Sequence, residues 1–413
     1  MKPMTNMKPK TSIISILVFV ATLAVVFISI MSVLFPALIV VSVSPYQDSI
    51  PINPLEPGVW ALHFFAVNIT LLVLGLLYFK KRLPTLIMRS IKTILDFEVS
   101  KKVTFVIMLV LISSYIGFTV PELSEPEIWG DFEGVKNQVD NWSFNDGKGL
   151  VQFRHFLLNI SINIFDSYRM VPFLFSIALL ILTYFFTVKI SQKRFSGILA
   201  VMVILQSYLF LEYDTTATYE NIWTVLYLVS LYTIYKKWYL SPFAFIFSVF
   251  SKSLTAVFLP MSLFFICRSD IPKRDVVKAL IPYGIIIALF IAVFYLGNLP
   301  IDSPLDYYES DFDDLSFWRG FTSFSYQLRY DGLVLTLVLP LVVGLYLVSR
   351  RGVRQADSIM IMIMGMLLAA PLLVSLTTST IQPYRFVPLV VFFAIGVGTL
   401  FSKRLIERPQ DSP

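Results

Sequence analysis

Residues 121–169 read PELSEPEIWGDFEGVKNQVDNWSFNDGKGLVQFRHFLLNISINIFDSYR. This polar, acid-rich stretch lies between two apolar segments, in a chain that is otherwise mostly hydrocarbon. A connection between two membrane helices needs neither this length nor this many acids. We therefore expect the stretch to carry the function, and the remaining chain to hold it at a membrane surface.

The composition indicates the class of protein. The chain has 413 residues, of which 56% are hydrophobic and 15% charged, and its mean hydropathy is +0.75. These values lie outside the range of soluble globular proteins and, with long repeated apolar runs, predict an all-α polytopic membrane protein. The net charge of +6 comes from residues at the ends of the apolar runs, so we expect no nucleic-acid partner. One cysteine and two histidines exclude an intrachain disulfide and a histidine-rich metal centre.

The apolar runs predict about twelve transmembrane helices. The first run is longer than the core of a signal peptide, so we interpret it as a retained span. The second is followed by a basic segment, up to residue 102, expected to lie along the membrane surface. The interval 239–266 is interrupted by Lys252 and is interpreted as a helical hairpin with Lys252 at or near its tip. The predicted spans are 12–43, 59–79, 103–120, 171–190, 196–211, 221–235, the two arms of 239–266, 279–297, 332–348, 359–376 and 386–401.

Charge predicts the orientation of these spans. Most of the 33 Lys and Arg fall on one side, so the positive-inside rule places both termini in the cytoplasm. Most of the acids fall on the other side, which indicates that function is concentrated on the outer face. The expected organisation is an N-terminal pair of spans with the basic segment (1–102), a catalytic core (103–404) and a cytoplasmic tail (405–413). The expected outer loops are 121–169, 212–220, 298–331 and 377–385. Within the first of them, 149–165 has the apolar spacing of an interfacial helix.

Two acidic groups stand just outside predicted spans. Asp131 and Glu133 occur in WGDFEG, and Glu212 and Asp214 occur in EYD. Closely spaced carboxylates act as general bases, bind hard cations through oxygen, or are simply solvated. The residues alone leave these readings open.

A few cations lie on the outer side or at membrane depth, among them Arg154, Arg169, Lys252 and Arg385. A charge at membrane depth is costly and is usually functional, although a lysine also reaches the interface by extending its side chain. Acids and cations that face each other beside a bilayer suggest a lipid phosphate held by the cations and a reacting hydroxyl near an acid.

The order of these parts resembles the GT-C class of integral-membrane glycosyltransferases, which includes dolichyl-phosphate-mannose protein mannosyltransferases and aminoarabinose-lipid transferases. The resemblance covers roughly residues 103–404. The matching segments are WGDFEG, HFLLNISINIFDSYRMVPFLFSI, KRFSGILAVM, EYDTTATYEN, FSVFSKSLTAVFLP and PYRFVPLVVF. Three features depart from the family: the proline pair near His155 is missing, Glu133 follows Asp131 by two positions instead of one, and two spans precede the core.

The resemblance implies a function and a set of site residues. The donor would be a sugar on a polyprenyl (dolichyl) phosphate in the bilayer, and the acceptor a hydroxyl of a protein, lipid or glycan at the extracytoplasmic face. Asp131, with Glu133 as the second candidate, would be the general base of an inverting transfer. Arg169, Lys252, Arg385 and His155 would bind the donor phosphate. EYD resembles the ExD metal motif of oligosaccharyltransferases, which implies a divalent cation such as Mg²⁺ or Mn²⁺ at Glu212 and Asp214; no other cofactor is expected.

Two other classes of function compete with this interpretation. A multi-pass transporter or lipid flippase also uses many spans and intramembrane charges. It predicts repeated halves and acids within the spans, whereas no clear internal repeat is evident and the acids cluster in loops. A structural membrane subunit would leave Lys252 and the Asp131 loop unexplained.

Overall fold

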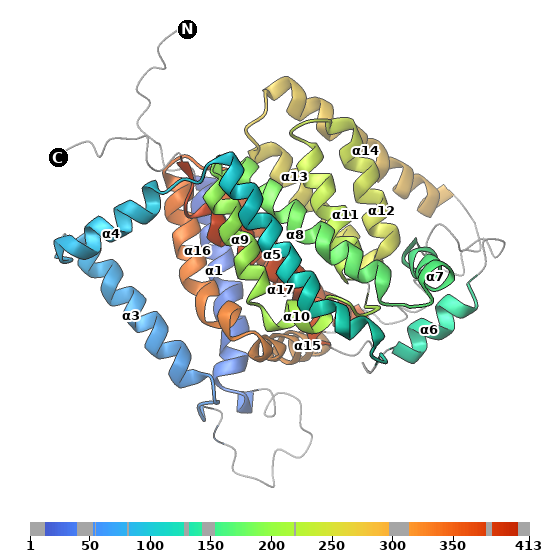
Figure 1. Cartoon of the computed structure of the whole chain (residues 1–413), viewed down its shortest axis with the longest axis horizontal. Coiled ribbons are helices and arrows are strands. Elements are labelled where there is room, and N and C mark those ends of the chain that lie inside the picture. The colour runs from blue at the N-terminus through green and yellow to red at the C-terminus, as the bar shows by residue number, and fades with distance from the viewer. Residues whose placement is uncertain are drawn as a thin grey trace.

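The computed structural model describes residues 13–38, 53, 55–80, 82–127, 132–142, 153–218, 220–296, 314–376 and 382–403. Within these ranges every regular element is a helix, which confirms the expected all-α class (Figure 1). Five described helical segments are long and apolar enough to cross a membrane, judged by length and composition. They are α1 (Ile13–Leu34), α3 (Ala61–Phe79), α5 (Lys101–Thr119) with the 3-10 helix η1 (Val120–Ser124), α8 (Met170–Ser191) and α16 (Gly332–Arg350). The full set of twelve spans stays a prediction.

The other elements include shorter apolar helices and several 3-10 turns. They are α4 (Thr85–Asp96), α6 (Phe132–Asp140), α7 (Phe153–Phe165), α9 (Arg194–Leu205), α10 (Tyr208–Tyr213), α11 (Glu220–Thr233), η3 (Trp238–Leu240), α12 (Ser241–Ser251), η4 (Ser253–Phe258), α13 (Leu259–Arg268), α14 (Lys273–Leu296), α15 (Asp314–Tyr326), η5 (Gln327–Tyr330), α17 (Gln355–Leu376), η6 (Pro383–Phe386) and α18 (Val387–Thr399). The amphipathic helix α4 lies at the edge of the bundle with no buried residue, as its basic sequence predicts (Figure 1).

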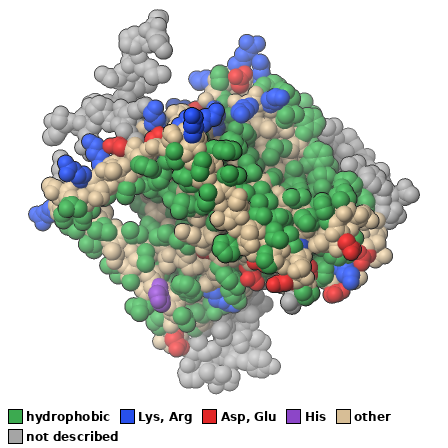
Figure 2. Space-filling model, in the orientation of Figure 1, with side chains coloured by type: hydrophobic (Ala, Val, Ile, Leu, Met, Phe, Trp, Pro, Cys, Tyr) green, Lys and Arg blue, Asp and Glu red, His purple; other side chains and the backbone are tan. Residues whose placement is uncertain are grey.

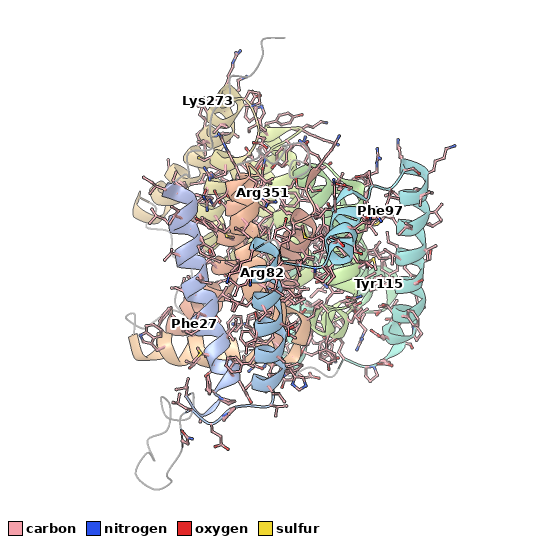
Figure 3. All side chains as sticks on the ribbon, turned by 90° about the vertical axis from the view of Figure 1, so that its left-hand side faces the viewer. Phe27, Arg82, Phe97, Tyr115, Lys273 and Arg351 are labelled. Carbon is pink, nitrogen blue, oxygen red and sulfur yellow. The ribbon has the colours of Figure 1, made fainter. Side chains whose placement is uncertain are left out.

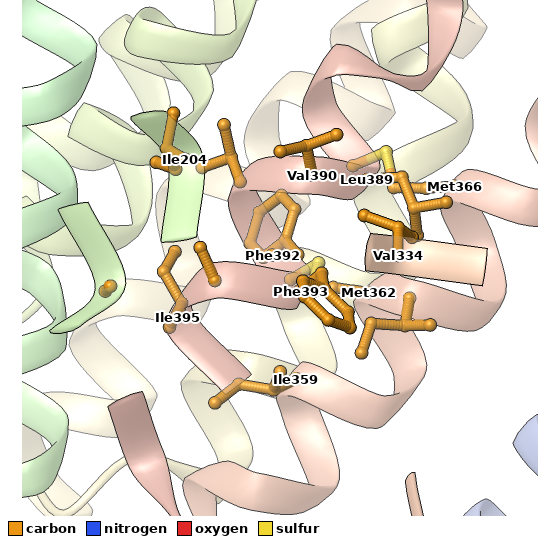
Figure 4. Close-up of a cluster of buried hydrophobic side chains, with 14 of the residues drawn as sticks. Ile204, Val334, Ile359, Met362, Met366, Leu389, Val390, Phe392, Phe393 and Ile395 are labelled. Atoms are coloured by element: carbon orange, nitrogen blue, oxygen red, sulfur yellow. The ribbon is translucent and has the colours of Figure 1, made fainter. Parts of the chain in front are cut away.

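Helix α18 forms the centre of the bundle. Its sequence is apolar on every face, which is typical of a helix surrounded by other helices, and all of its residues except Val397 are buried. It packs against α8, α9, α16 and α17. Figure 4 shows Phe392 and Phe393 of α18 beside Met362 of α17 and Val334 of α16. The core of the described structure is therefore built around a helix from the C-terminal third of the sequence, and residues of many earlier helices pack against it.

Gly398 allows α18 to approach its neighbours closely. A Cβ atom at this position would lie 2.5 Å from Cγ2 of Thr187 on α8 and 2.6 Å from the carbonyl oxygen of Ser196 on α9. We expect Gly398→Ala to lower the free energy of unfolding by about 1–3 kcal/mol, because an overpacked core forces neighbouring groups to shift. Thermal unfolding of the purified protein measures this. The matched control is Gly117→Ala on α5, where a Cβ atom meets nothing within 4 Å and alanine favours the helix. Equal melting temperatures for the two variants would contradict the close approach.

The two ends of the bundle carry opposite charge. Lys and Arg gather along the upper edge in Figure 2, and Asp and Glu along the lower edge. Figure 3 places Lys273 and Arg351 toward the upper end and Tyr115 toward the lower end. We call these the basic end and the acidic end. The acidic end holds η1, η5, η6, α6, α7 and residues 212–218 and 220, so it brings together the described parts of the predicted outer loops.

The interval around Lys252 turns as expected. Helix α12 ends at Lys252, where the backbone is extended, and η4 and α13 then lead back toward the basic end. There Arg268 forms a buried ion pair with Asp357 of α17. Ser15 of α1 donates a hydrogen bond of 2.8 Å to the same carboxylate. The hairpin is therefore tied to both α1 and α17 at the basic end.

Two elements differ from the sequence prediction. The expected span 196–211 is divided into α9 and α10, because the Ser207 side chain caps α10 through the amide of Phe210 and also donates a hydrogen bond to Asp331. Helix α15 lies in the predicted outer loop 298–331, and it packs against α17 and α1. Many acids precede α15 in the sequence and lower the mean hydropathy of this segment, so hydropathy alone did not predict a helix there.

Candidate functional site

The turn between α10 and α11 is the centre of the acidic end. Its described residues from Asp214 to Thr218, together with Glu220, are all buried, although a short polar run predicts a solvated loop. The Ser176 hydroxyl of α8 donates to the carbonyl oxygen of Asp214 at 2.6 Å, and the Asn221 amide donates to the same oxygen at 3.1 Å. The backbone of the turn is thus built into the bundle.

Arg169 connects this turn to the end of η1. Its guanidinium donates hydrogen bonds to the hydroxyl of Thr215 at 3.1 Å and to the carbonyl of Pro126 at 2.9 Å. Its Nε lies 3.7 Å from a carboxylate oxygen of Glu127, and that oxygen also accepts the amide of Ala217 at 3.1 Å. Arg169 was expected to bind the donor phosphate. In the structure its fork is directed at protein groups, so its first role is to position the turn.

A buried ion pair joins Glu220 and Lys252. Glu220 lies in the first turn of α11, and only 1% of its side chain is exposed, against 10% for Lys252. Trp223 donates its indole N–H to the other carboxylate oxygen of Glu220. The Lys252 ammonium lies 5.8 Å from the centroid of the Trp223 ring, within the range of a cation–π contact. The sequence interpretation selected Lys252 but not its partner.

Two arginines add to the positive charge at Lys252. Arg385 of η6 and Arg154 of α7 both lie close enough to Lys252 to repel its charge. Lys252 therefore has one carboxylate partner, Glu220, and two neighbouring cations, and we call these four residues the cation cluster. Among the described residues, Arg385 Nε and Nη1 are buried without a hydrogen-bond partner. Buried guanidinium donors are normally paired, so this arrangement is suited to an anion.

His155 differs from its predicted role. The side chain is fully buried, and burial, followed by the charge of Arg154, lowers its pKa to about 3. Arg154 Nε donates a hydrogen bond of 3.1 Å to His155 Nε2. A neutral histidine supplies no charge to a phosphate, so the cation that α7 contributes is Arg154. His155 orients it.

The two acids of EYD have different surroundings. Asp214 is buried, and its carboxyl group faces the hydroxyl of Tyr115 without completing a hydrogen bond of good geometry. Burial raises the pKa of Asp214 to about 7. Glu212 is exposed and lies near Tyr208. No three His, Cys, Asp or Glu side chains in the described ranges form a group that could hold a metal ion. The two acids have different surroundings, the divalent cation expected at Glu212 and Asp214 stays a prediction, and we derive no step through a metal.

The predicted base Asp131 lies outside the described residues. Glu133 is exposed in the first turn of α6. A small apolar cluster joins α6 and α7 to the buried turn; its residues are Val135, Val139, Leu158 and Ala217, with Phe132 and Tyr168 packed against them. The Tyr168 hydroxyl donates to Asp140 at 2.6 Å. Helix α6 is thus anchored beside the turn that precedes Glu220.

Sequence reasoning missed Glu127 and Glu220 as site residues, because both read as ordinary loop acids. Asn221 was the available signal for Glu220, since a polar pair at the start of an apolar span needs partners inside the protein. No family model matches the chain, and no curated protein or solved structure is significantly similar to it. The fold and the cation cluster are therefore the observations on which a function is argued.

Proposed function

We propose that the chain is a membrane glycosyltransferase. It would transfer a sugar from a polyprenyl-phosphate donor to an acceptor hydroxyl, at the extracytoplasmic face of a protein with about twelve spans. The observation that carries the proposal is the cation cluster, in which Lys252, Arg385 and Arg154 outnumber the one buried carboxylate, Glu220, at the acidic end. A lipid phosphate is an anion that is confined to the membrane edge, and this position suits it.

The chemistry assigns different tasks to the two kinds of charge. The acceptor oxygen attacks the anomeric carbon of the donor while the bond from that carbon to the phosphate oxygen breaks. The electron pair of the broken bond leaves with the phosphate, so negative charge grows on the leaving group. Arg385 and Lys252 would stabilise that charge electrostatically. The proton of the acceptor hydroxyl passes to a carboxylate base, for which the resemblance supplies Asp131 and then Glu133.

Glu220 and Arg169 act indirectly in this proposal. Glu220 offsets part of the positive charge, so that Lys252 stays buried without a bound anion. Arg169 holds the turn and the end of η1 together through Thr215 and Pro126. A transporter would instead need an anion site that opens to both sides of the membrane. The cation cluster lies at one end of the bundle, which favours transfer.

Transfer of radiolabelled sugar from polyprenyl-phosphate donors, by purified protein in lipid nanodiscs, tests the proposal. We expect activity in the wild type and its loss in Asp131→Asn. Arg385→Gln is expected to reduce transfer on the order of a hundredfold, as when one donor to a developing anion is removed. The matched control is Arg351→Gln, an exposed arginine at the basic end, which should change nothing. Folded wild type that consumes no such donor would overturn the proposed class, and full activity in Arg385→Gln would remove the phosphate assignment.

A further inference from the structure

A second concave site lies at the acidic end. It is an open hollow of about 400 Å³, within the size range of small-molecule sites. Three segments build it: α10, the turn η5, and the start of η6. Helix η6 serves both sites, because Pro383 lines the hollow while Arg385 belongs to the cation cluster. The hollow is therefore a neighbour of the cation cluster and is distinct from it.

Aromatic rings form much of the rim of the hollow. Tyr208 is 55% exposed and Tyr330 is 40% exposed. The guanidinium of Arg329 stacks 3.8 Å from the centroid of the Tyr326 ring and 4.6 Å from that of Tyr330. It also donates a hydrogen bond of 2.8 Å to the Tyr330 hydroxyl. These contacts hold Tyr330 in place, so an aromatic surface is presented without a large loss of side-chain entropy on binding.

Besides Leu209, Tyr213 and Pro383, the remaining lining is polar and balanced in charge. Gln327 and Gln382 each present an amide with both donors and acceptors, and Glu212 and Arg329 contribute one charge of each sign. A bound anion would be repelled by Glu212, which has the same charge. A bound cation would be repelled in the same way by Arg329. The set instead matches a ligand with many neutral hydroxyl groups and an apolar C–H face, which is the chemistry of a hexose.

We infer that this hollow binds a neutral sugar unit of a carbohydrate acceptor. The Tyr208 and Tyr330 rings would contact the C–H face of the sugar. Its hydroxyl groups would form hydrogen bonds with the side chains of Gln327, Gln382 and Glu212. The role as acceptor site rests on the proposed function, whereas sugar binding itself does not. The inference narrows the acceptor from protein, lipid or glycan to a glycan or to the glycan portion of a glycoconjugate.

Saturation-transfer NMR with methyl glycosides of glucose, mannose, galactose and N-acetylglucosamine tests the binding. The full chain is placed in lipid nanodiscs, because maltoside detergents would themselves compete. We expect saturation transfer to at least one glycoside, binding that is weakened about tenfold by Tyr330→Ala, and binding that is retained in Tyr208→Phe but lost in Tyr208→Ala. Tyr239→Ala is the control, since Tyr239 of η3 is similarly exposed, at 49%, and lies at the basic end. The inference would be overturned if no glycoside showed saturation transfer, or if the Tyr330→Ala variant showed as much saturation transfer as the wild type. The tyrosines would then be interfacial anchors.

The acceptor role has its own readout. In the transfer assay, Tyr330→Ala should raise the KM for a glycan acceptor and leave the KM for the polyprenyl-phosphate donor unchanged. A raised donor KM would assign the hollow to the donor sugar and overturn the acceptor role. Sugar binding in a chain that transfers nothing would refute the proposed function while the carbohydrate site stands.

Discussion

Replacing Glu220 by glutamine is expected to destabilise the protein by about 3–5 kcal/mol, the usual effect of removing one partner of a buried ion pair. Glu220 is the one carboxylate of the cation cluster, so its loss leaves Lys252, Arg385 and Arg154 facing one another. Lys252→Met should cost less, about 1–3 kcal/mol. In that variant the carboxylate keeps the Trp223 indole donor, and the two arginines no longer face a third cation.

The inequality between the two variants is the informative result. Chemical unfolding of the purified protein in micelles compares them, and the double variant Glu220→Gln/Lys252→Met should recover part of the loss. Glu98→Gln is the control: Glu98 pairs with Arg194 at 4.0 Å with 41% of its side chain exposed, and exposed pairs contribute little. If Lys252→Met proves the more damaging change, the cluster does not carry the excess positive charge that the proposed function requires.

Asp214→Asn is expected to stabilise the protein at pH 8 and to change little at pH 4. The folded state raises the pKa of Asp214 from 3.8 to about 7, mainly by burial. The unfolded chain therefore releases this proton at a lower pH than the folded protein does. The contribution of Asp214 to the free energy of unfolding is therefore largest below pH 4. It falls as the pH rises from about 4 to 7 and is constant above that range. The shift corresponds to a loss on the order of 4 kcal/mol.

The measurement is the melting temperature at several pH values between 4 and 8, for wild type and Asp214→Asn side by side. The asparagine variant should lack the decline that the wild type shows over this interval. Other acids titrate in the same range in both proteins, so the difference between the two curves isolates Asp214. Superimposable curves would show that the carboxyl group is solvated or paired, contrary to its burial beside Tyr115.

Much of the fold follows from the sequence. Long apolar runs predict helices wherever they occur, because a membrane helix needs a continuous apolar surface and satisfies its own backbone. The turn at Lys252 is predicted in the same way, since each apolar piece beside it is too short to span alone. The opposite charge of the two ends is also present in the sequence, in the order of basic and acidic connections.

The candidate site follows from the sequence only in part. Lys252 and Arg385 were selected because charges near a membrane are rare, and a rare charge beside an apolar run can be recognised from the sequence alone. His155 was selected for its position in a motif, but its protonation depends on burial and on Arg154. Arg169 was selected both as one of these rare cations and for its position in a motif, and what it does depends on Thr215 and Pro126, each more than 40 residues distant.

The sequence by itself therefore determined that this protein is helical, that its helices are suited to a membrane, and that its acids and bases separate to opposite ends. Only the tertiary structure decided which charges meet. Hydropathy and the order of charges are properties of residues that are close in the sequence, so they do not depend on how the helices pack against one another. The Glu220–Lys252 pair, the buried carboxyl group of Asp214 and the tyrosine-rimmed hollow depend on contacts between distant segments, which close packing and the cost of burying an unpaired charge select together.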